Sequence, residues 1–168
     1  MALITLLGGH GIGKSTAVRR WADKYGIDVY SLDDLRKEYY DNDAKCALVL
    51  KLQAEQKVSV IETAKGYSAF MLKLLPTDPV IVVHPATPAI GKQLMEARKG
   101  KALTPWWGAK QLHYELIEKF KNFCAKNMKR SQCKFFAITT QETDWEPVDE
   151  YFGSLFRKIN NQLIREAK

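Results

Sequence analysis

The sequence lacks the features that mark membrane and secreted proteins. No apolar run approaches the roughly 20 residues of a membrane-spanning helix, and the first apolar stretch, 2–7, leads into a glycine-rich loop where a signal peptide would have a cleavage site. Cysteine is scarce and odd in number, without the spacing of a metal site: Cys46, Cys124 and Cys133. We therefore expect no membrane partner, and free thiols without chemistry of their own in a reducing cytoplasm.

Acidic residues are also in deficit. The chain has 19 Asp and Glu against 26 Lys and Arg, which gives a net charge of +7. Such a surface attracts polyanions, so a nucleic acid is a natural partner, although the same excess also serves bound phosphates and solubility. Basic residues are concentrated in 92–110, together with Trp106 and Trp107.

Repeats and low-complexity segments are absent, and the 168 residues suit one domain with a substantial core. Strand-like and helix-like patterns alternate, which predicts an α/β fold with a five-stranded parallel sheet flanked by helices. The expected strands are 2–7, 28–31, 57–62, 79–83 and 134–139. The expected helices are 15–25, a region from 31 to about 56 broken near 41–43, 67–74, 89–99, a long helix around 112–123, and one from about 148.

The strongest functional signal is the segment Gly8–Ser15, which fits the phosphate-loop pattern G-x-x-x-x-G-K-[ST] between a strand and a helix. Glycines let backbone N–H groups turn toward phosphate oxygens, and the helix N-terminus adds positive charge. Lys14 supplies a charge for the β- and γ-phosphates, and the Ser15 hydroxyl is a ligand for Mg²⁺. We expect ATP and Mg²⁺ to be bound here, by Gly8, Gly9, His10, Gly11, Ile12, Gly13, Lys14, Ser15 and Thr16.

A second set of candidates follows the expected second strand, because ligands of parallel sheets bind at the carboxyl ends of strands. Asp33 or Asp34 can accept a proton from an acceptor hydroxyl, and Asp33 is preferred because it is closer to the strand. Arg36 can hold an acceptor phosphate with two hydrogen bonds. The alternative is that one Asp caps the helix and Arg36 forms a solvated ion pair.

Later strand ends give further candidates. Glu62 is expected to orient Mg²⁺ or its water, or else to be a polar strand terminus. His84 is assigned no catalytic role, and Thr140 is expected to contact the nucleotide base together with Thr139 and Gln141.

A basic loop lies between two expected helices, with Arg98, Lys99 and Lys101 around Gly100. Such a loop can close over the triphosphate, exclude water and bring an arginine to the transferred group. A solvated basic turn is the alternative.

These motifs resemble the P-loop kinases of the nucleotide-kinase type, with a nucleoside-monophosphate-kinase-like fold and a short lid, and within them the polynucleotide 5′-hydroxyl kinases. Asp33-Asp34-Leu35-Arg36 is similar to that family's Asp-Asp-x-Arg segment, and 98–105 is similar to its lid. The resemblance implies that Asp33 is the general base, that Arg36 contacts an acceptor phosphate, and that Arg98 (in a lid at about 98–106) joins Lys14 in catalysis.

The resemblance leaves the acceptor open. Phage-type P-loop kinases that phosphorylate a hydroxymethylated pyrimidine in DNA, such as 5-hydroxymethyluracil, are related, and Trp106 and Trp107 either stack on bases or pack in the core or lid. We expect one kinase domain, 1–168, that moves the γ-phosphate of ATP to a hydroxyl on DNA or another nucleic acid, in the cytoplasm (a host's, if the protein is viral). The alternatives are a kinase of free nucleosides, nucleotides or other small metabolites, and an NTPase that switches or moves. The oligomeric state is open.

Overall fold

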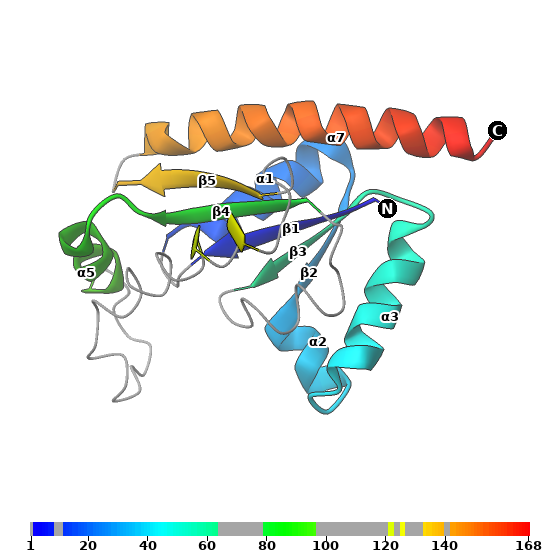
Figure 1. The fold of residues 1–168 in the computed structure, drawn as a ribbon, viewed down its shortest axis with the longest axis horizontal. Coiled ribbons are helices and arrows are strands. Elements are labelled where there is room, and N and C mark those ends of the chain that lie inside the picture. The colour runs from blue at the N-terminus through cyan, green and yellow to red at the C-terminus, as the bar shows by residue number, and fades with distance from the viewer. Residues whose placement is uncertain are drawn as a thin grey trace.

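The computed structural model describes residues 2–8, 12–63, 79–96, 121–122, 125–126, 133–139 and 142–168. Within these ranges a sheet of five strands runs through the molecule with helices on both faces (Figure 1). Every neighbouring pair is parallel and the strand order is β2-β3-β1-β4-β5. The strands are β1 Leu3–Gly8, β2 Asp28–Ser31, β3 Ser59–Thr63, β4 Val80–Pro85 and β5 Cys133–Ile138. The predicted five-stranded parallel α/β fold is confirmed.

The helices begin and end close to the expected positions. They are α1 Lys14–Tyr25, α2 Leu32–Glu38, α3 Asp43–Ala54, α5 Pro88–Glu96, the 3-10 helix η3 Glu142–Trp145 and α7 Glu146–Glu166. The expected break near 41–43 separates α2 from α3, because Asn42 caps α3 by accepting a hydrogen bond from the backbone N–H of Lys45. The helices expected at 67–74 and around 112–123 lie wholly or almost wholly outside the described residues.

Two apolar layers hold the helices on the sheet, and β1 contributes to both because side chains alternate along a strand. Leu3 and Leu7 pack in the layer beneath α2 and α3. Ile4 and Leu6 pack in the layer beneath α1 and α7. All six residues of β1 are buried, as expected for the central strand of a parallel sheet covered on both faces.

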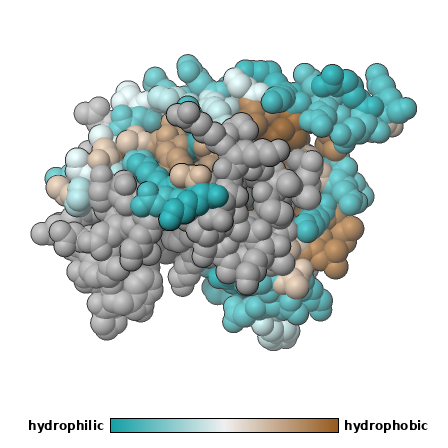
Figure 2. Space-filling view, viewed as in Figure 1, coloured by the Kyte–Doolittle hydropathy of each residue, from teal (hydrophilic) through white to brown (hydrophobic). Residues whose placement is uncertain are grey.

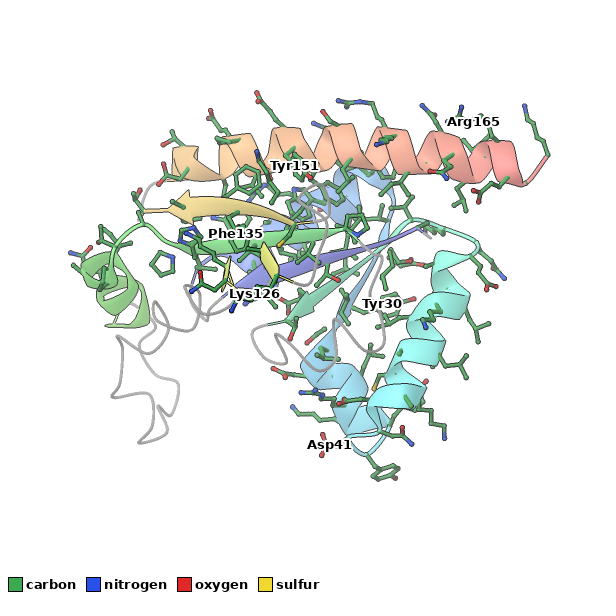
Figure 3. All side chains as sticks on the ribbon, in the orientation of Figure 1. Tyr30, Asp41, Lys126, Phe135, Tyr151 and Arg165 are labelled. Carbon is green, nitrogen blue, oxygen red and sulfur yellow. The ribbon has the colours of Figure 1, made fainter. Side chains whose placement is uncertain are left out.

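Aromatic contacts join α7 to α1 and to the edge of the sheet. The rings of Trp21 and Phe152 are stacked with their centroids 4.0 Å apart. The Trp21 indole also donates a hydrogen bond to Asp149, at 2.7 Å. Tyr151 lies on the sheet side of α7 (Figure 3), with its ring 5.6 Å from that of Phe136 in β5.

The surface of α3 carries exposed apolar side chains, Leu48 and Leu52, and Figure 2 shows a brown patch beside hydrophilic atoms in this region. After the end of α2, Tyr40 and Asp41 have positive φ angles of 52° and 60°, a backbone conformation that residues other than glycine rarely adopt. In the part of the chain that the structure describes, no helix is both long and apolar enough to span a membrane.

Candidate active site

The two described ends of the phosphate loop are positions that require glycine. Gly8 pairs with Val83 of β4, and a Cβ on Gly8 would lie 2.6 Å from Val83 Cγ2 and 2.9 Å from the Val83 carbonyl oxygen. Gly13 precedes α1 with a φ of 103°, which only glycine adopts without strain. The middle of the loop, Gly9, His10 and Gly11, lies outside the described residues.

Lys14 joins the two ends of this loop. Its side chain is buried in the first turn of α1, and its ammonium group donates a hydrogen bond to the carbonyl of Gly8. A buried ammonium adds its positive charge to that of the helix N-terminus. The geometry therefore concentrates positive charge at the carboxyl end of the central strand, where an anion is best stabilised.

The residues predicted to bind or orient a magnesium ion lie on the side of the sheet that α1 covers. Ser15 and Thr16 are exposed in the first turn of α1. Glu62 is partly exposed and aligned with Leu6 of β1, and strand alternation places it on the same sheet face as Val60, beneath α1.

A hydroxyl and one carboxylate suit Mg²⁺, which takes its other ligands from phosphates and water. Among the described residues, no group of three or more His, Cys, Asp and Glu side chains could hold a metal by itself. Ser15 and Glu62 therefore fit a metal that arrives with a nucleotide.

The candidates after β2 lie, like the phosphate loop, at the carboxyl ends of the strands, but β3 separates β2 from β1 in the sheet. Asp33 and Asp34 are exposed in the first turn of α2. Arg36 Nε and Nη2 donate to Asp43 over 2.9 and 3.3 Å. In this structure Arg36 therefore forms an ion pair, which was the alternative to contact with an acceptor. Contact of Arg36 with an acceptor stays a prediction.

The remaining candidates are held by local contacts or lie outside the described residues. His84 is buried and its Nδ1 is 2.9 Å from the carbonyl oxygen of Pro85. The backbone N–H of Thr139 donates to Asp144 at 2.7 Å. The residues outside the described part are Arg98, Lys99, Lys101, Trp106, Trp107, Thr140 and Gln141.

Asp144 and Trp145 were not predicted from the sequence. The hydroxyl and backbone N–H of Thr139 both donate to Asp144 and lower the pKa of its carboxyl. Trp145 is buried, and its indole N–H donates to the carbonyl of Ile12 in the phosphate loop at 3.1 Å. One signal was available: Trp145 extends the apolar stripe of α7 by one turn, ahead of Val148 and Phe152.

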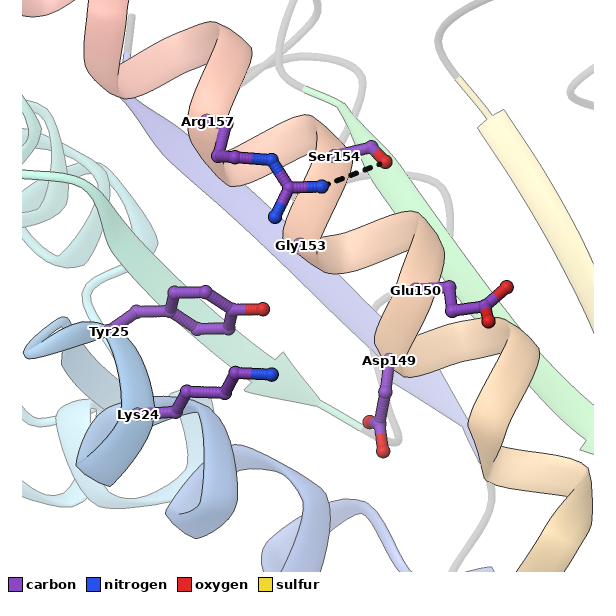
Figure 4. A pocket seen from close by; sticks show the side chains of 7 residues that line it. All are labelled: Lys24, Tyr25, Asp149, Glu150, Gly153, Ser154 and Arg157. Atoms are coloured by element: carbon purple, nitrogen blue, oxygen red, sulfur yellow. Dashed lines mark hydrogen bonds between the residues drawn. The ribbon is translucent and has the colours of Figure 1, made fainter.

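A separate hollow lies between α7 and the end of α1, far along α1 from the phosphate loop (Figure 4). It is lined by side chains of both charge signs: Lys24, Tyr25, Asp149, Glu150, Gly153, Ser154 and Arg157. None of the predicted site residues lines it, so we place the candidate active site at the phosphate loop.

No protein family model matches the chain, and no curated protein matches it significantly. Solved structures do match over nearly its whole length. A shikimate kinase from Bacteroides thetaiotaomicron shares 17% identity over 93% of this chain and 98% of its own, with a TM-score of 0.55. A shikimate kinase from Acinetobacter baumannii, in complex with shikimate, shares 15% identity over 94% of each chain, with a TM-score of 0.56.

A deoxyadenosine kinase from M. mycoides shares 13% identity over 90% of this chain and 99% of its own, with a TM-score of 0.53. At these identities the likeness establishes the fold: the chain has the P-loop fold that these small kinases share. All three bear the name of a kinase, in agreement with the prediction of a phosphotransferase.

Proposed function

We propose that the chain is an ATP-dependent kinase, a single domain that transfers the γ-phosphate to a hydroxyl group. The observation that carries this proposal is the buried Lys14 at the start of α1, which directly follows Gly13 and donates a hydrogen bond to the carbonyl of Gly8. This arrangement stabilises a phosphate chain through backbone amides, the helix N-terminus and one ammonium. The kinases of similar fold support the same function.

On the donor side, Lys14 exchanges its hydrogen bond to Gly8 for the β- and γ-phosphate oxygens of ATP. Ser15 and Glu62 hold Mg²⁺ or its water. The metal, when bound, neutralises charge on the transferred phosphoryl group.

On the acceptor side, Asp33 accepts the proton of the attacking hydroxyl, since it is an exposed carboxylate at the carboxyl end of β2. Arg36 turns from Asp43 to an acidic group of the acceptor. Arg98 and the lid at 98–106, outside the described residues, complete the site over the phosphates.

We propose a nucleic acid as the acceptor, because the net charge of +7 favours a polyanion over a small neutral substrate. DNA with a 5′-hydroxyl end or a hydroxymethylated pyrimidine has the required hydroxyl. A free nucleoside, a nucleotide or another small metabolite is the second candidate, supported by the likeness to a shikimate kinase and a deoxyadenosine kinase.

The test is transfer of radiolabelled γ-phosphate from ATP to a panel of acceptors. The panel holds 5′-hydroxyl DNA and RNA, DNA with hydroxymethylated pyrimidines, free nucleosides and nucleotides, and shikimate. We expect label on a nucleic acid, with KM for that acceptor rising steeply with salt, and none with Lys14→Ala. Label on small compounds alone overturns the nucleic-acid proposal, and ATP hydrolysis without any labelled acceptor overturns the kinase.

A further inference from the structure

Trp145 lies directly against the phosphate loop, although 133 positions separate it from Ile12 along the chain. Its indole N–H donates to the carbonyl of Ile12 at 3.1 Å, and its side chain is buried. Its ring atoms Nε1, Cε2 and Cζ2 lie 3.1, 3.5 and 3.7 Å from the place where a Cβ on Gly13 would stand. The indole therefore occupies the space that a larger residue at position 13 would need.

This hydrogen bond fixes the plane of the peptide between Ile12 and Gly13. A trans peptide is planar, and its C=O and N–H bonds point in opposite directions. With the carbonyl of Ile12 held toward the indole, the N–H of Gly13 must point away from Trp145. In a phosphate loop such an amide is one of the donors that bind phosphate oxygens.

Trp145 is itself held from two sides. Its neighbour Asp144 accepts hydrogen bonds from the backbone N–H and the hydroxyl of Thr139, directly after β5. On the other side, Val148 and Phe152 of α7 pack in the same apolar layer as Trp145 and Ile12. The segment that carries Trp145 is therefore anchored to the end of β5 through Asp144, and the indole packs with residues of α7.

We propose that Trp145 is a positioning residue for the nucleotide: it sets the orientation of the Gly13 amide and thereby pre-organises the phosphate loop. The proposal rests on the proposed function, because it assumes that this loop binds ATP. A loop whose amide is already oriented loses less conformational freedom on binding, so the contribution of Trp145 is measured as ATP affinity.

The test compares two substitutions of the same chemistry in the same apolar layer. Trp145→Phe keeps an aromatic ring beside Gly13 but removes the N–H that holds the Ile12 carbonyl. Trp21→Phe removes an indole N–H from Asp149 instead, on the part of α1 beyond its first turn. Isothermal titration with ATP and Mg²⁺ gives the Kd of each variant, and thermal unfolding gives its Tm.

We expect Trp145→Phe to raise the Kd for ATP about fivefold, the factor equivalent to about 1 kcal/mol for one hydrogen bond. Trp21→Phe should lower Tm at least as much but change Kd less than about twofold, since distant sites act independently. An unchanged Kd in Trp145→Phe, or an equal rise in both variants, overturns the proposal. Lys14→Ala separates this result from failure of the function itself: if Lys14→Ala binds ATP as the wild type does, the loop is no ATP site.

Discussion

The phosphate loop and the start of the α2–α3 hairpin (residues 32–54) follow the carboxyl ends of β1 and β2, but they are held in different ways. The loop is fixed by buried contacts: Lys14 on Gly8, and Trp145 on Ile12 and Gly13. The hairpin presents exposed acids and the half-exposed ion pair of Arg36 with Asp43. In the proposed kinase we therefore expect ATP binding to depend on close packing at the loop, and acceptor binding to depend on the charges of α2.

The largest effect that separates the two regions is expected from Asp33→Asn. An amide has nearly the same size but cannot take a proton, so kcat should fall roughly 100-fold or more while the Kd for ATP stays near that of the wild type. Asp34→Asn is the matched control, because Asp34 is also an exposed carboxylate in the first turn of α2. Normal kcat in Asp33→Asn, measured by γ-phosphate transfer, would remove Asp33 from the mechanism.

Gly8→Ala tests the donor end by geometry alone. The new methyl group would meet Val83 Cγ2 at 2.6 Å and a backbone oxygen at 2.9 Å, so β1 and β4 must separate, at a cost of about 2 kcal/mol in unfolding free energy. ATP affinity should fall as well, because the separation of β1 from β4 also moves the carbonyl of residue 8, which accepts the hydrogen bond of Lys14.

Gly26→Ala is the control for that substitution. Gly26 has a positive φ of 62°, and a Cβ there would have no neighbour within 4 Å, so Gly26→Ala introduces backbone strain of about 1 kcal/mol without a clash. Urea unfolding measures both variants. Equal stability losses, with ATP affinity intact in Gly8→Ala, would contradict the role of close packing at the loop.

A smaller effect is expected from Arg36→Ala. Loss of its charged hydrogen bonds should raise KM for the acceptor about tenfold and leave KM for ATP unchanged. Asp43→Ala removes the ion pair but keeps the guanidinium. If Asp43→Ala raises KM for the acceptor as much as Arg36→Ala does, the arginine acts by holding α2 to α3, and its assignment to the acceptor is wrong.

The smallest effect concerns acid stability at the start of η3. The pKa of Asp144 is lowered by its hydrogen bonds with Thr139, so the carboxylate stabilises the fold above its ordinary pKa of 3.8, and this stabilisation is lost as pH falls through the lowered value. Between about pH 5 and pH 2, wild-type Tm should therefore fall more than that of Asp144→Asn. Thr139→Val, which keeps only the backbone donor, should be intermediate. Parallel pH profiles would contradict the role of this pair.

The sequence alone predicts most of the fold because its signals are local. β2 occupies the predicted residues 28–31, and the break between α2 and α3 coincides with the cap at Asn42. The glycines and Lys14 of the phosphate loop are likewise recognisable from short-range spacing.

The sequence did not predict contacts between residues that are far apart in the chain, or contacts of a side chain that has more than one possible partner. Local spacing contains no information on which carbonyl a distant indole will reach, so the bond from Trp145 to Ile12 could not be foreseen. The sequence left open whether Arg36 contacts an acceptor or forms a solvated ion pair, and it did not identify Asp43 as the partner, because that choice depends on which groups the fold brings near the guanidinium. The apolar spacing of Val148 and Phe152, both buried in α7, is recognisable in the sequence, and one further turn toward the N-terminus includes Trp145.

The long-range hydrogen bond of Trp145 also has a consequence for how the protein matures during translation. Ile12 leaves the ribosome 133 residues before Trp145, the residue whose indole holds its carbonyl. We therefore expect the nascent loop to reach this arrangement only after η3 and the start of α7 have been made and, if the loop binds ATP as proposed, nucleotide affinity to appear late in folding.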